Sequence, residues 1–308
     1  MTEAYTIGID GGGTKTRAVL IDAQGNERAS ALSGPSNFHV VGTERAEASL
    51  QTAIRDVLDA AGLVATDISA LGLGLAGAAR PQDKETVRAM VSRIAHFDPV
   101  FITHDAETAL VGATGRRYGV VLIAGTGAIA YGINARGESR RADGWGHLLG
   151  DEGSAYWIGR EGLRAVVRAH DGRGPSTDLT ERLLFHQSLP EPSKLIRHVY
   201  GGSFGTTEMA ALAPVVERAA LDDDGVAQDI LQRAGRHLGK TLSTVISGLN
   251  MNSQAFDVAL MGGVLTAKGI VHTAVVASLT QAAPHAHAID PRHDAAWGAA
   301  RLAQLATE

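Results

Sequence analysis

The chain of 308 residues contains no cysteine. Disulfide bonds, iron–sulfur clusters, thiolate zinc sites and cysteine nucleophiles are therefore excluded together. The absence also suits a reducing compartment. No apolar run reaches the roughly 18 residues that a membrane-spanning helix needs, and residues 1–4 lack the basic start of a secretory signal. We therefore expect a cytoplasmic protein without a membrane partner.

Neither positive nor negative charge is present in large excess. Lys and Arg number 28 and Asp and Glu 33, so the net charge is −5 with His neutral. A mildly acidic chain has no electrostatic footprint for nucleic acid, and we expect no such partner. Its length suggests about two domains with a sizeable core.

Glycine, in contrast, is abundant, with 37 residues in 308, or about 12% against a usual ~7%. Glycine concentrates where the backbone turns sharply or approaches a ligand closely. The positions of the glycines therefore guide the search for a functional site.

The chain alternates short apolar runs with amphipathic stretches, which predicts an α/β fold. We expect strands at residues 5–10, 16–22, 27–33, 70–76, 99–103, 119–124, 128–134 and 256–261. We expect helices at residues 43–62, 83–96, 105–113, 152–170, 205–221, 226–249, from about 263 to 280, and 293–306. The sequence of strand, glycine turn and strand occurs at residues 7–20 and again at 120–133. This echo predicts two similar lobes, 1–116 and 117–308, with a cleft between them and the last helix packing back on the first lobe.

The first glycine turn reads DGGGTKT over residues 10–16. Three glycines at a strand end leave backbone N–H groups free to point at phosphate oxygens. Thr14 adds a hydroxyl and Lys15 a positive charge. Asp10 could hold Mg²⁺ directly or through water. The alternative is an ordinary hairpin turn.

Two further glycine pairs have similar chemistry. Gly125 and Gly127 flank Thr126 after the second-lobe strand, and could hold phosphates as the first turn does. Gly262 and Gly263 follow the strand at 256–261 and could lie flat against a planar base. Together the three segments predict one ATP site.

Two other glycine patterns resemble nucleotide motifs but fail their requirements. The GLGLAG segment at residues 72–77 overlaps a strand instead of following one, as a dinucleotide fingerprint must. The GRHLGKT segment at 235–241 is one residue too short for a P-loop and lies within an amphipathic helix. We interpret both as packing glycines.

Asp105 follows the strand at 99–103 and opens a helix. A carboxylate at a strand end can accept a hydroxyl proton as a general base. An N-cap aspartate has the same sequence signature, so both interpretations remain open.

Residues 143–158 hold the densest set of functional residue types. Trp145 stands between two glycines, and Asp151 and Glu152 form an acid pair at a helix start. Sugars are often gripped by an aromatic plate together with carboxylates that accept from hydroxyl groups. Asn37 is a further candidate for reading hydroxyls. The alternative is a loop that ends in helix-capping acids.

Three histidines near the C-terminus, His285, His287 and His293, invite a test for a metal site. No acid or third ligand is fixed nearby, so structural or solvent-exposed histidines are the stronger interpretation.

These motifs, in this order, resemble the BadF/BadG/BcrA/BcrD-type ATPase family, and within it the N-acetylglucosamine kinases. The resemblance rests on residues 9–16, 103–106, 123–127 and 144–154, and extends to 262–264 and 292–299. It implies an α/β, two-lobed actin-like ATPase fold (ribonuclease H-like) with a central cleft. It also implies ATP, Mg²⁺ and phosphorylation of the 6-hydroxyl of an amino sugar. We expect a homodimer, since dimers are the commonest oligomers.

Carried over by position, the resemblance makes Asp105 the catalytic base and places Asp10 near Mg²⁺. It assigns the phosphates to Gly12, Gly13, Thr14, Lys15, Thr126 and Gly127, adenosine to Gly262 and Gly263, and the sugar to Asn37, Asp105, Trp145, Gly146 and Asp151. Phe38 stands where related kinases tend to have His-Trp after the Asn, and Ala128-Ile129 where Ser-Asn is frequent. These departures leave the preferred amino sugar open.

The composition excludes two other classes of protein in the superfamily. The activators of 2-hydroxyacyl-CoA dehydratases bind an iron–sulfur cluster through Cys, and ROK-type kinases have a Cys-rich zinc site. Neither is possible in a chain without Cys. The remaining alternatives are a glucosamine kinase, an N-acetylmuramic acid kinase and a non-catalytic sugar sensor.

Overall fold

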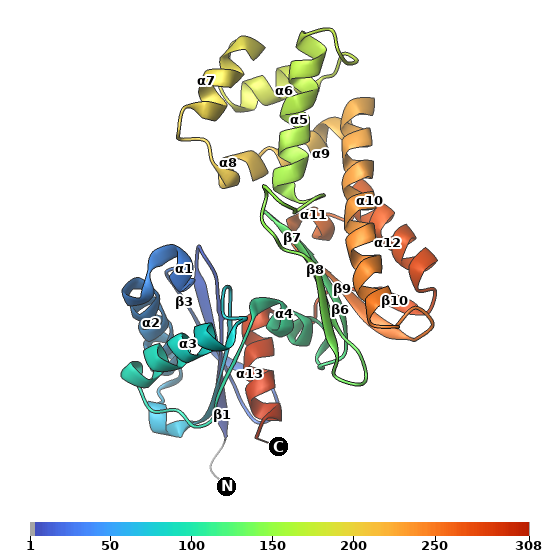
Figure 1. Cartoon of the computed structure of the whole chain (residues 1–308). Coiled ribbons are helices and arrows are strands. Elements are labelled where there is room, and N and C mark those ends of the chain that lie inside the picture. The colour runs from blue at the N-terminus through green and yellow to red at the C-terminus, as the bar shows by residue number, and fades with distance from the viewer. Residues whose placement is uncertain (1–3, 308) are drawn as a thin grey trace. The chain divides into compact units, whose positions relative to one another are not determined.

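The computed structural model describes residues 4–307, which form two compact units. The first unit comprises residues up to 121, together with 135–137 and 291 onward; the second comprises 122–134 and 138–290. The chain therefore returns to the first unit at its end. Each unit is described by itself (Figure 1).

The first unit is built on a five-stranded sheet with the order β3-β2-β1-β4-β5. Its strands are β1 (Tyr5–Gly11), β2 (Thr16–Ile21), β3 (Glu27–Ser33), β4 (Ile68–Leu75) and β5 (Val100–Thr103). Its helices are α1 (Phe38–Val41), α2 (Thr43–Ala61), α3 (Pro81–Ile94), α4 (Asp105–Thr114) and α13 (Ala295–Leu305), with a short 3₁₀ turn at Ala65–Asp67. β1 runs antiparallel to β2 and parallel to β4. Helices α2 and α3 cover one face, and α4 and α13 the other (Figure 1).

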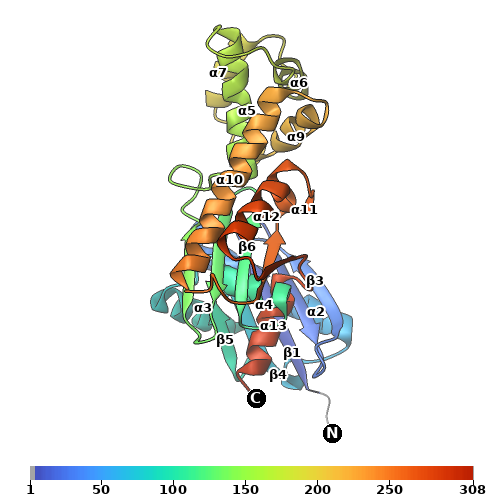
Figure 2. The same cartoon turned by 90° about the vertical axis from the view of Figure 1, so that its right-hand side faces the viewer.

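The second unit contains a five-stranded sheet with the order β10-β9-β6-β7-β8. Its strands are β6 (Gly119–Ala124), which starts in the first unit, β7 (Ala128–Ile133), β8 (Ser139–Asp143), β9 (Phe256–Met261) and β10 (Ala286–Ile289). Its helices are α5 (Ala155–His170), α6 (Leu179–His186), α7 (Leu195–Tyr200), α8 (Thr206–Ala210), α9 (Ala213–Leu221), α10 (Gly225–Gly248), α11 (Gly263–Thr266) and α12 (Ile270–Ala282), with a 3₁₀ turn at Pro192–Lys194. The long α10 packs along α12 (Figure 2).

The two sheets have the same topology. In each, three consecutive strands lie side by side, and the next two strands of the unit continue the sheet from the first of the three. The echo between residues 7–20 and 120–133 therefore reflects β1-β2 and β6-β7, and the expected structural repeat is confirmed.

Glycine lets helices approach the sheet and one another closely. A Cβ at Gly72 would lie 1.9 Å from the Ala299 carbonyl oxygen of α13, and one at Gly235 2.5 Å from the Ala274 Cβ of α12. Any side chain at these positions would force the elements apart. The interpretation of residues 72–77 and 235–241 as packing segments is confirmed at these two glycines.

Several predicted elements need correction. The helix expected at 152–170 begins only at Ala155, because the Ser154 hydroxyl caps it by accepting from the Trp157 N–H. The helix expected at 205–221 is two helices, α8 and α9, and Pro214 lies in the first turn of the second. Strand β8 and helices α6 and α7 were not predicted, since their short stretches lack a clear apolar period.

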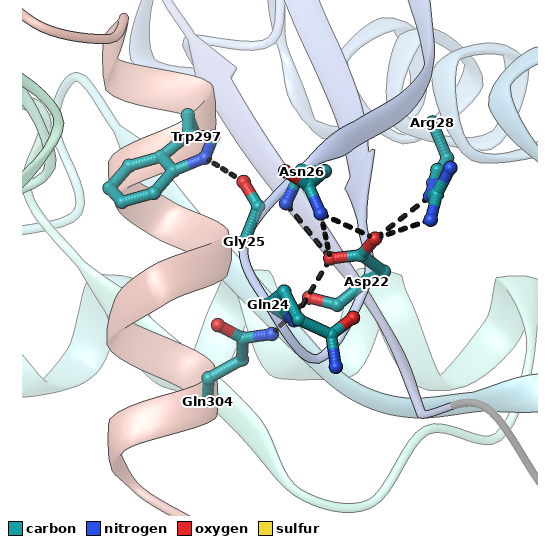
Figure 3. A network of polar contacts seen from close by, with 7 residues as sticks. All are labelled: Asp22, Gln24, Gly25, Asn26, Arg28, Trp297 and Gln304. Atoms are coloured by element: carbon teal, nitrogen blue, oxygen red, sulfur yellow. Dashed lines mark hydrogen bonds and ion pairs between the residues drawn. The ribbon is translucent and has the colours of Figure 1, made fainter.

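A polar network ties the β2–β3 turn together around Asp22, which is only 2% exposed (Figure 3). Its Oδ1 accepts from the backbone N–H groups of Gln24 and Asn26, both at 2.9 Å. Its Oδ2 accepts from Asn26 Nδ2 and Arg28 Nε, also at 2.9 Å. Burial opposes ionisation, but the hydrogen bonds and the Arg28 charge outweigh it, so the pKa of the Asp22 carboxyl is lowered.

The same turn anchors the C-terminal helix α13 (Figure 3). Trp297 Nε1 donates to the Gly25 carbonyl at 2.8 Å, and Gln304 Nε2 donates to the Asp22 carbonyl at 2.8 Å. These bonds join residues more than 270 positions apart in sequence. They fix the last helix on the first unit.

Asp22→Asn should lower the free energy of unfolding by about 2–4 kcal/mol, because an amide places donors against the donors of Asn26 and Arg28. A carboxyl whose pKa is lowered by folding stabilises the fold at a pH above its pKa in the unfolded chain. This stabilisation is lost as the pH falls through the pKa of the carboxyl in the folded protein. The deficit of the variant, measured by urea unfolding, should therefore shrink below about pH 4. Asp59→Asn, at an exposed position of α2, is the matched control. A deficit that is constant down to pH 3 would contradict the role of the ionised carboxylate.

Candidate active site

The first glycine turn connects β1 to β2 at residues 12–15. Gly12 N donates to the Lys15 carbonyl at 3.0 Å, while Thr14 and Lys15 are exposed. A Cβ at Gly13 would meet nothing within 4 Å, so the backbone of the turn is open to a ligand. A phosphate-binding turn needs a backbone that is open in this way.

Asn37 lies against this turn. The Gly12 carbonyl accepts from the N–H groups of Ser36 at 3.0 Å and Asn37 at 3.1 Å. The Asn37 Oδ1 caps α1 by accepting from the His39 N–H at 3.2 Å. The amide Nδ2 of Asn37 therefore remains as a hydrogen-bond donor beside the turn. A residue that binds sugar hydroxyl groups needs such a donor.

Asp10 lies on the sheet face that α4 and α13 cover. Its parallel partner in β4 is Gly74, where a Cβ would lie 2.2 Å from the Thr108 Oγ1 of α4. Two residues earlier on the same face, a Cβ at Gly8 would lie 2.0 Å from the Ala296 carbonyl of α13. Asp10 therefore faces the beginnings of both helices.

Three carboxylates share this region. The pKa of Asp10 is raised to about 6, and burial is the largest cause. The negative charges of Asp105 and Asp294 raise this pKa further, whereas the positive charge of Lys15 lowers it. Asp294 caps α13, because its Oδ1 accepts from the Trp297 N–H at 2.9 Å. It was not singled out from the sequence, where its only signal is an Asp just before the last helix.

This donor set fits a magnesium ion bound together with phosphates. Within residues 4–307, no three His, Asp or Glu side chains form a cluster able to hold a metal by themselves. Mg²⁺ usually takes only one or two protein carboxylates and keeps waters and substrate oxygens. A cation at Asp10 would also relieve the repulsion among the three carboxylates.

Asp105 is the first residue of α4, and its side chain is exposed. The N-cap is His104, whose Nδ1 accepts from the Glu107 N–H at 3.3 Å. Asp105 Oδ1 accepts from the Ala106 N–H at 2.9 Å, and within residues 4–307 no hydrogen bond or ion pair engages Oδ2. The N-cap alternative for Asp105 is therefore wrong, and its carboxylate is accessible for chemistry.

Glu107 fixes the turn that carries Asp105. It is 6% exposed, and its carboxylate accepts from Thr103 Oγ1 at 2.5 Å and from Arg117 Nε at 2.7 Å. The bond from Thr103 spans the strand-to-helix turn on both sides of Asp105. No sequence pattern points to the buried pair of Thr103 and Glu107, which follows from the packing of α4.

The second glycine turn connects β6 to β7. Gly125 N donates to the Gly127 carbonyl at 2.9 Å, and Thr126 between them is exposed. The Gly125 carbonyl accepts from the Ala155 N–H at 2.8 Å, so the turn is joined to the start of α5. Gly262 packs against it, since a Cβ there would lie 2.3 Å from the Ala124 carbonyl.

Asp151 lies directly beneath this second turn. It is 7% exposed, has a left-handed backbone with φ of 61°, and accepts from the Ala128 N–H at 3.0 Å. Its own N–H donates to Asp143 Oδ1 at 2.9 Å. A Cβ at Gly127 would lie 2.8 Å from Asp151 Oδ2. Burial is the main cause that raises the pKa of Asp151. The neighbouring Glu152 is exposed.

Trp145 stands on the surface of the same loop. It is 65% exposed, flanked by Gly144 and Gly146 with φ of 74° and 84°. The guanidinium of Arg141 lies over the indole, 4.9 Å from its centroid. Because the cation covers only one face of the ring, the other face can still stack against a ligand.

Within residues 4–307, the three histidines near the C-terminus are not part of any group of three His, Asp or Glu side chains able to hold a metal ion. His293, in the first unit, stacks on Trp297 of α13 with ring centroids 4.0 Å apart. His285 and His287, in the second unit, are exposed.

A family model described as the BadF/BadG/BcrA/BcrD ATPase family matches residues 7–303. The chain belongs to this family. The resemblance inferred from the motifs is therefore confirmed, and so is the α/β actin-like ATPase fold.

Three relatives are similar over almost their whole length. An N-acetylmuramic acid/N-acetylglucosamine kinase of Clostridium acetobutylicum is 33% identical, with 97% of this chain and 98% of that protein covered. An N-acetyl-D-glucosamine kinase of Dictyostelium discoideum is 35% identical, with 98% of each covered. A crystal structure from Chromobacterium violaceum, provisionally assigned as an N-acetylglucosamine kinase, has 28% identity and a TM-score of 0.77, with 98% and 99% covered.

Asp10→Asn should stabilise the ligand-free protein at pH 8 by about 1–3 kcal/mol, because it removes a crowded charge. A carboxyl whose pKa is raised by folding does not destabilise the fold at a pH below its pKa in the unfolded chain. It destabilises the fold fully at a pH above its pKa in the folded protein, here about 6. The advantage of the variant, measured by urea unfolding, should roughly halve between pH 8 and pH 5. Asp59→Asn on α2 is the control. A variant less stable than the parent at pH 8 would refute the crowding of Asp10.

Proposed function

We propose that the chain is an ATP-dependent kinase that phosphorylates the 6-hydroxyl of an amino sugar, with N-acetylglucosamine as the first choice. The observation that carries the proposal is the exposed Asp105 carboxylate at the start of α4, on the same unit as an open glycine turn and Asn37. The nearly full-length similarity to kinases of amino sugars supports the substrate class.

Phosphates are bound by backbone and side chains of the two glycine turns. Gly12, Gly13, Thr14 and Lys15 act on the first unit, and Thr126 and Gly127 on the second. Adenosine lies against Gly262 and Gly263. Asp10 holds Mg²⁺, which neutralises charge on the phosphates when it is bound.

The residues that hold the sugar are Asn37, Asp105, Trp145, Gly146 and Asp151. Asn37 donates through Nδ2, and the exposed face of Trp145 stacks on the apolar face of the ring. The contacts of Asp151 with Ala128 and Asp143 hold its carboxylate at the second turn. Asp151 thus links the phosphate turn to the sugar loop.

Asp105 acts as general base. It accepts the proton of the sugar hydroxyl as the bond from that oxygen to the γ-phosphorus forms. The bond from the γ-phosphorus to the ADP oxygen breaks, ADP leaves, and the new ester oxygen carries no proton. Positioning supplies most of the rate enhancement in such transfers. The clamp of Thr103, Glu107 and Arg117 keeps the turn that carries Asp105 in one conformation.

A second candidate substrate is N-acetylmuramic acid, because the Clostridium relative is named for both sugars. A panel of N-acetylglucosamine, glucosamine, N-acetylmuramic acid, N-acetylmannosamine and glucose, with ATP and Mg²⁺, tests the proposal by sugar-dependent ADP release. We expect kcat/KM to be highest for N-acetylglucosamine and lowest for glucose. No sugar-dependent ADP release with any of the five would favour the non-catalytic sensor.

Asp105→Asn should lower kcat by about 10²–10⁴-fold, because the amide cannot take the hydroxyl proton. ADP affinity, measured by calorimetry, should change less than about threefold, since the phosphate turns are untouched. Asp59→Asn, an exposed exchange on the same unit, should keep full activity. Turnover of the Asp105 variant within tenfold of the parent would remove Asp105 from its role as base.

A further inference from the structure

Two buried hydroxyl groups lie between the first glycine turn and the segment that carries Asn37. Thr16, the first residue of β2, and Ser36 are both fully buried. The Thr16 Oγ1 lies 2.7 Å from the Gly34 carbonyl oxygen and 2.8 Å from the Ser36 Oγ. A hydroxyl has one proton to donate and a carbonyl can only accept, so Thr16 donates to Gly34 and Ser36 donates to Thr16. Neither side chain takes part in the proposed proton transfer or phosphate binding.

The Ser36 side chain also lies directly over the glycine that precedes the turn. A Cβ at Gly11 would lie 2.0 Å from the Ser36 Oγ. The backbone N–H groups of Ser36 and Asn37 both donate to the Gly12 carbonyl. The segment that carries Asn37 is therefore joined to the turn twice, by backbone bonds at Gly12 and by the hydroxyl pair at the start of β2.

The other side of Asn37 is held by more exposed contacts. Asn37 caps α1, which has only four residues, and its apolar side chains, Phe38 and Val41, are only partly buried against the core. His39 forms an ion pair with a carboxylate of α3, but the His39 side chain is 51% exposed. A single helical turn is marginally stable by itself, and ion pairs at the surface contribute little. Support of Asn37 from fully buried groups therefore comes from Ser36 and its neighbours.

We propose that Thr16 and Ser36 are positioning residues that hold the Asn37 amide beside the first glycine turn for contact with a sugar hydroxyl. The inference rests on the proposed function, since it takes Asn37 to bind the sugar. Without the bond between the two hydroxyl groups, the segment is joined to the turn mainly by its backbone bonds to Gly12. Asn37 then has more conformational freedom to lose when the sugar binds. Small misplacements of a binding group are costly in such sites.

Ser36→Ala removes this bond without disturbing the bond from Thr16 to Gly34. The test sugar is the one of the five-sugar panel that the parent binds most tightly, expected to be N-acetylglucosamine. Calorimetry should show about tenfold weaker binding of this sugar, whereas ADP affinity should change less than about threefold, because the backbone of the turn stays in place. Unchanged sugar affinity would overturn the proposal. Losses of equal size for sugar and ADP would mean a general structural role and would overturn it as well.

Asn37→Ala shows whether Ser36 acts through Asn37. In that background, Ser36→Ala should weaken sugar binding further by less than about twofold, since the amide that Ser36 positions is gone. A further tenfold loss would mean that Ser36 acts independently of Asn37, contrary to the proposal. Asn37→Ser replaces Asn37→Ala as the background if sugar binding to the latter is too weak to measure.

Thr16 and Ser33 supply the matched variants. Thr16→Ser keeps the hydroxyl and should bind the sugar within about twofold of the parent, whereas Thr16→Val, of similar volume, should bind it about tenfold more weakly. Ser33→Ala is the control, because the Ser33 Oγ donates to the Ser49 carbonyl at 2.7 Å in the same unit. It removes a bond of the same kind and should leave sugar affinity unchanged. Equal sugar affinities of Thr16→Ser and Thr16→Val would refute the role of the hydroxyl, and Ser36→Ala keeps the test valid should Thr16→Val fail to fold.

The same titrations separate this inference from the proposed function. A protein with the Ser36-dependent sugar affinity that releases no ADP with the sugar would refute the proposed function alone. A sugar kinase whose affinity for its sugar does not depend on Ser36 would refute only this inference. A protein that binds none of the five sugars would refute both.

Discussion

The first unit depends on how closely the last helix approaches its sheet. Gly8 and Gly72 have no side chain, so the backbone of α13 lies where a Cβ would otherwise be. This contact, with the bonds from Trp297 and Gln304 to the β2–β3 turn, holds the C-terminal segment on a unit formed mainly by the first 121 residues. It also brings Asp294 into the region of Asp10. One packing constraint thus completes both the fold and the charge pattern of the candidate site.

The charge pattern opposes stability and favours binding. Asp10 is crowded by two other carboxylates, which the ligand-free protein tolerates at a cost in folding free energy. A cation with its phosphates would reverse the sign of that interaction. Functional sites commonly retain such destabilising groups. The opposite case is Asp22, whose buried carboxylate is fully supplied with donors and stabilises the turn that anchors α13.

Much of the fold was predictable, because the elements with a clear apolar period were placed within a few residues. The strand–glycine–strand repeat predicted two related sheets, and the structure has them. The start of α5 was misplaced because Asp151 and Glu152 have the composition of a first helical turn. In the structure Asp151 is left-handed and buried under Gly127, and Ser154 caps the helix. A long-range contact overrode a local preference there.

The sequence by itself determined the family of the protein and which kinds of chemistry the chain cannot perform. Glycines at strand ends mark turns with bare backbone, and the absence of cysteine removes thiolate chemistry, because both are properties of residue types. Only the tertiary structure decided which groups share a microenvironment. Asp294 lies near Asp10 because α13, at the other end of the chain, packs on the first sheet. Glu107 meets Thr103 only once α4 packs against the end of β5. Such contacts follow from helix packing, which the local order of residues does not encode.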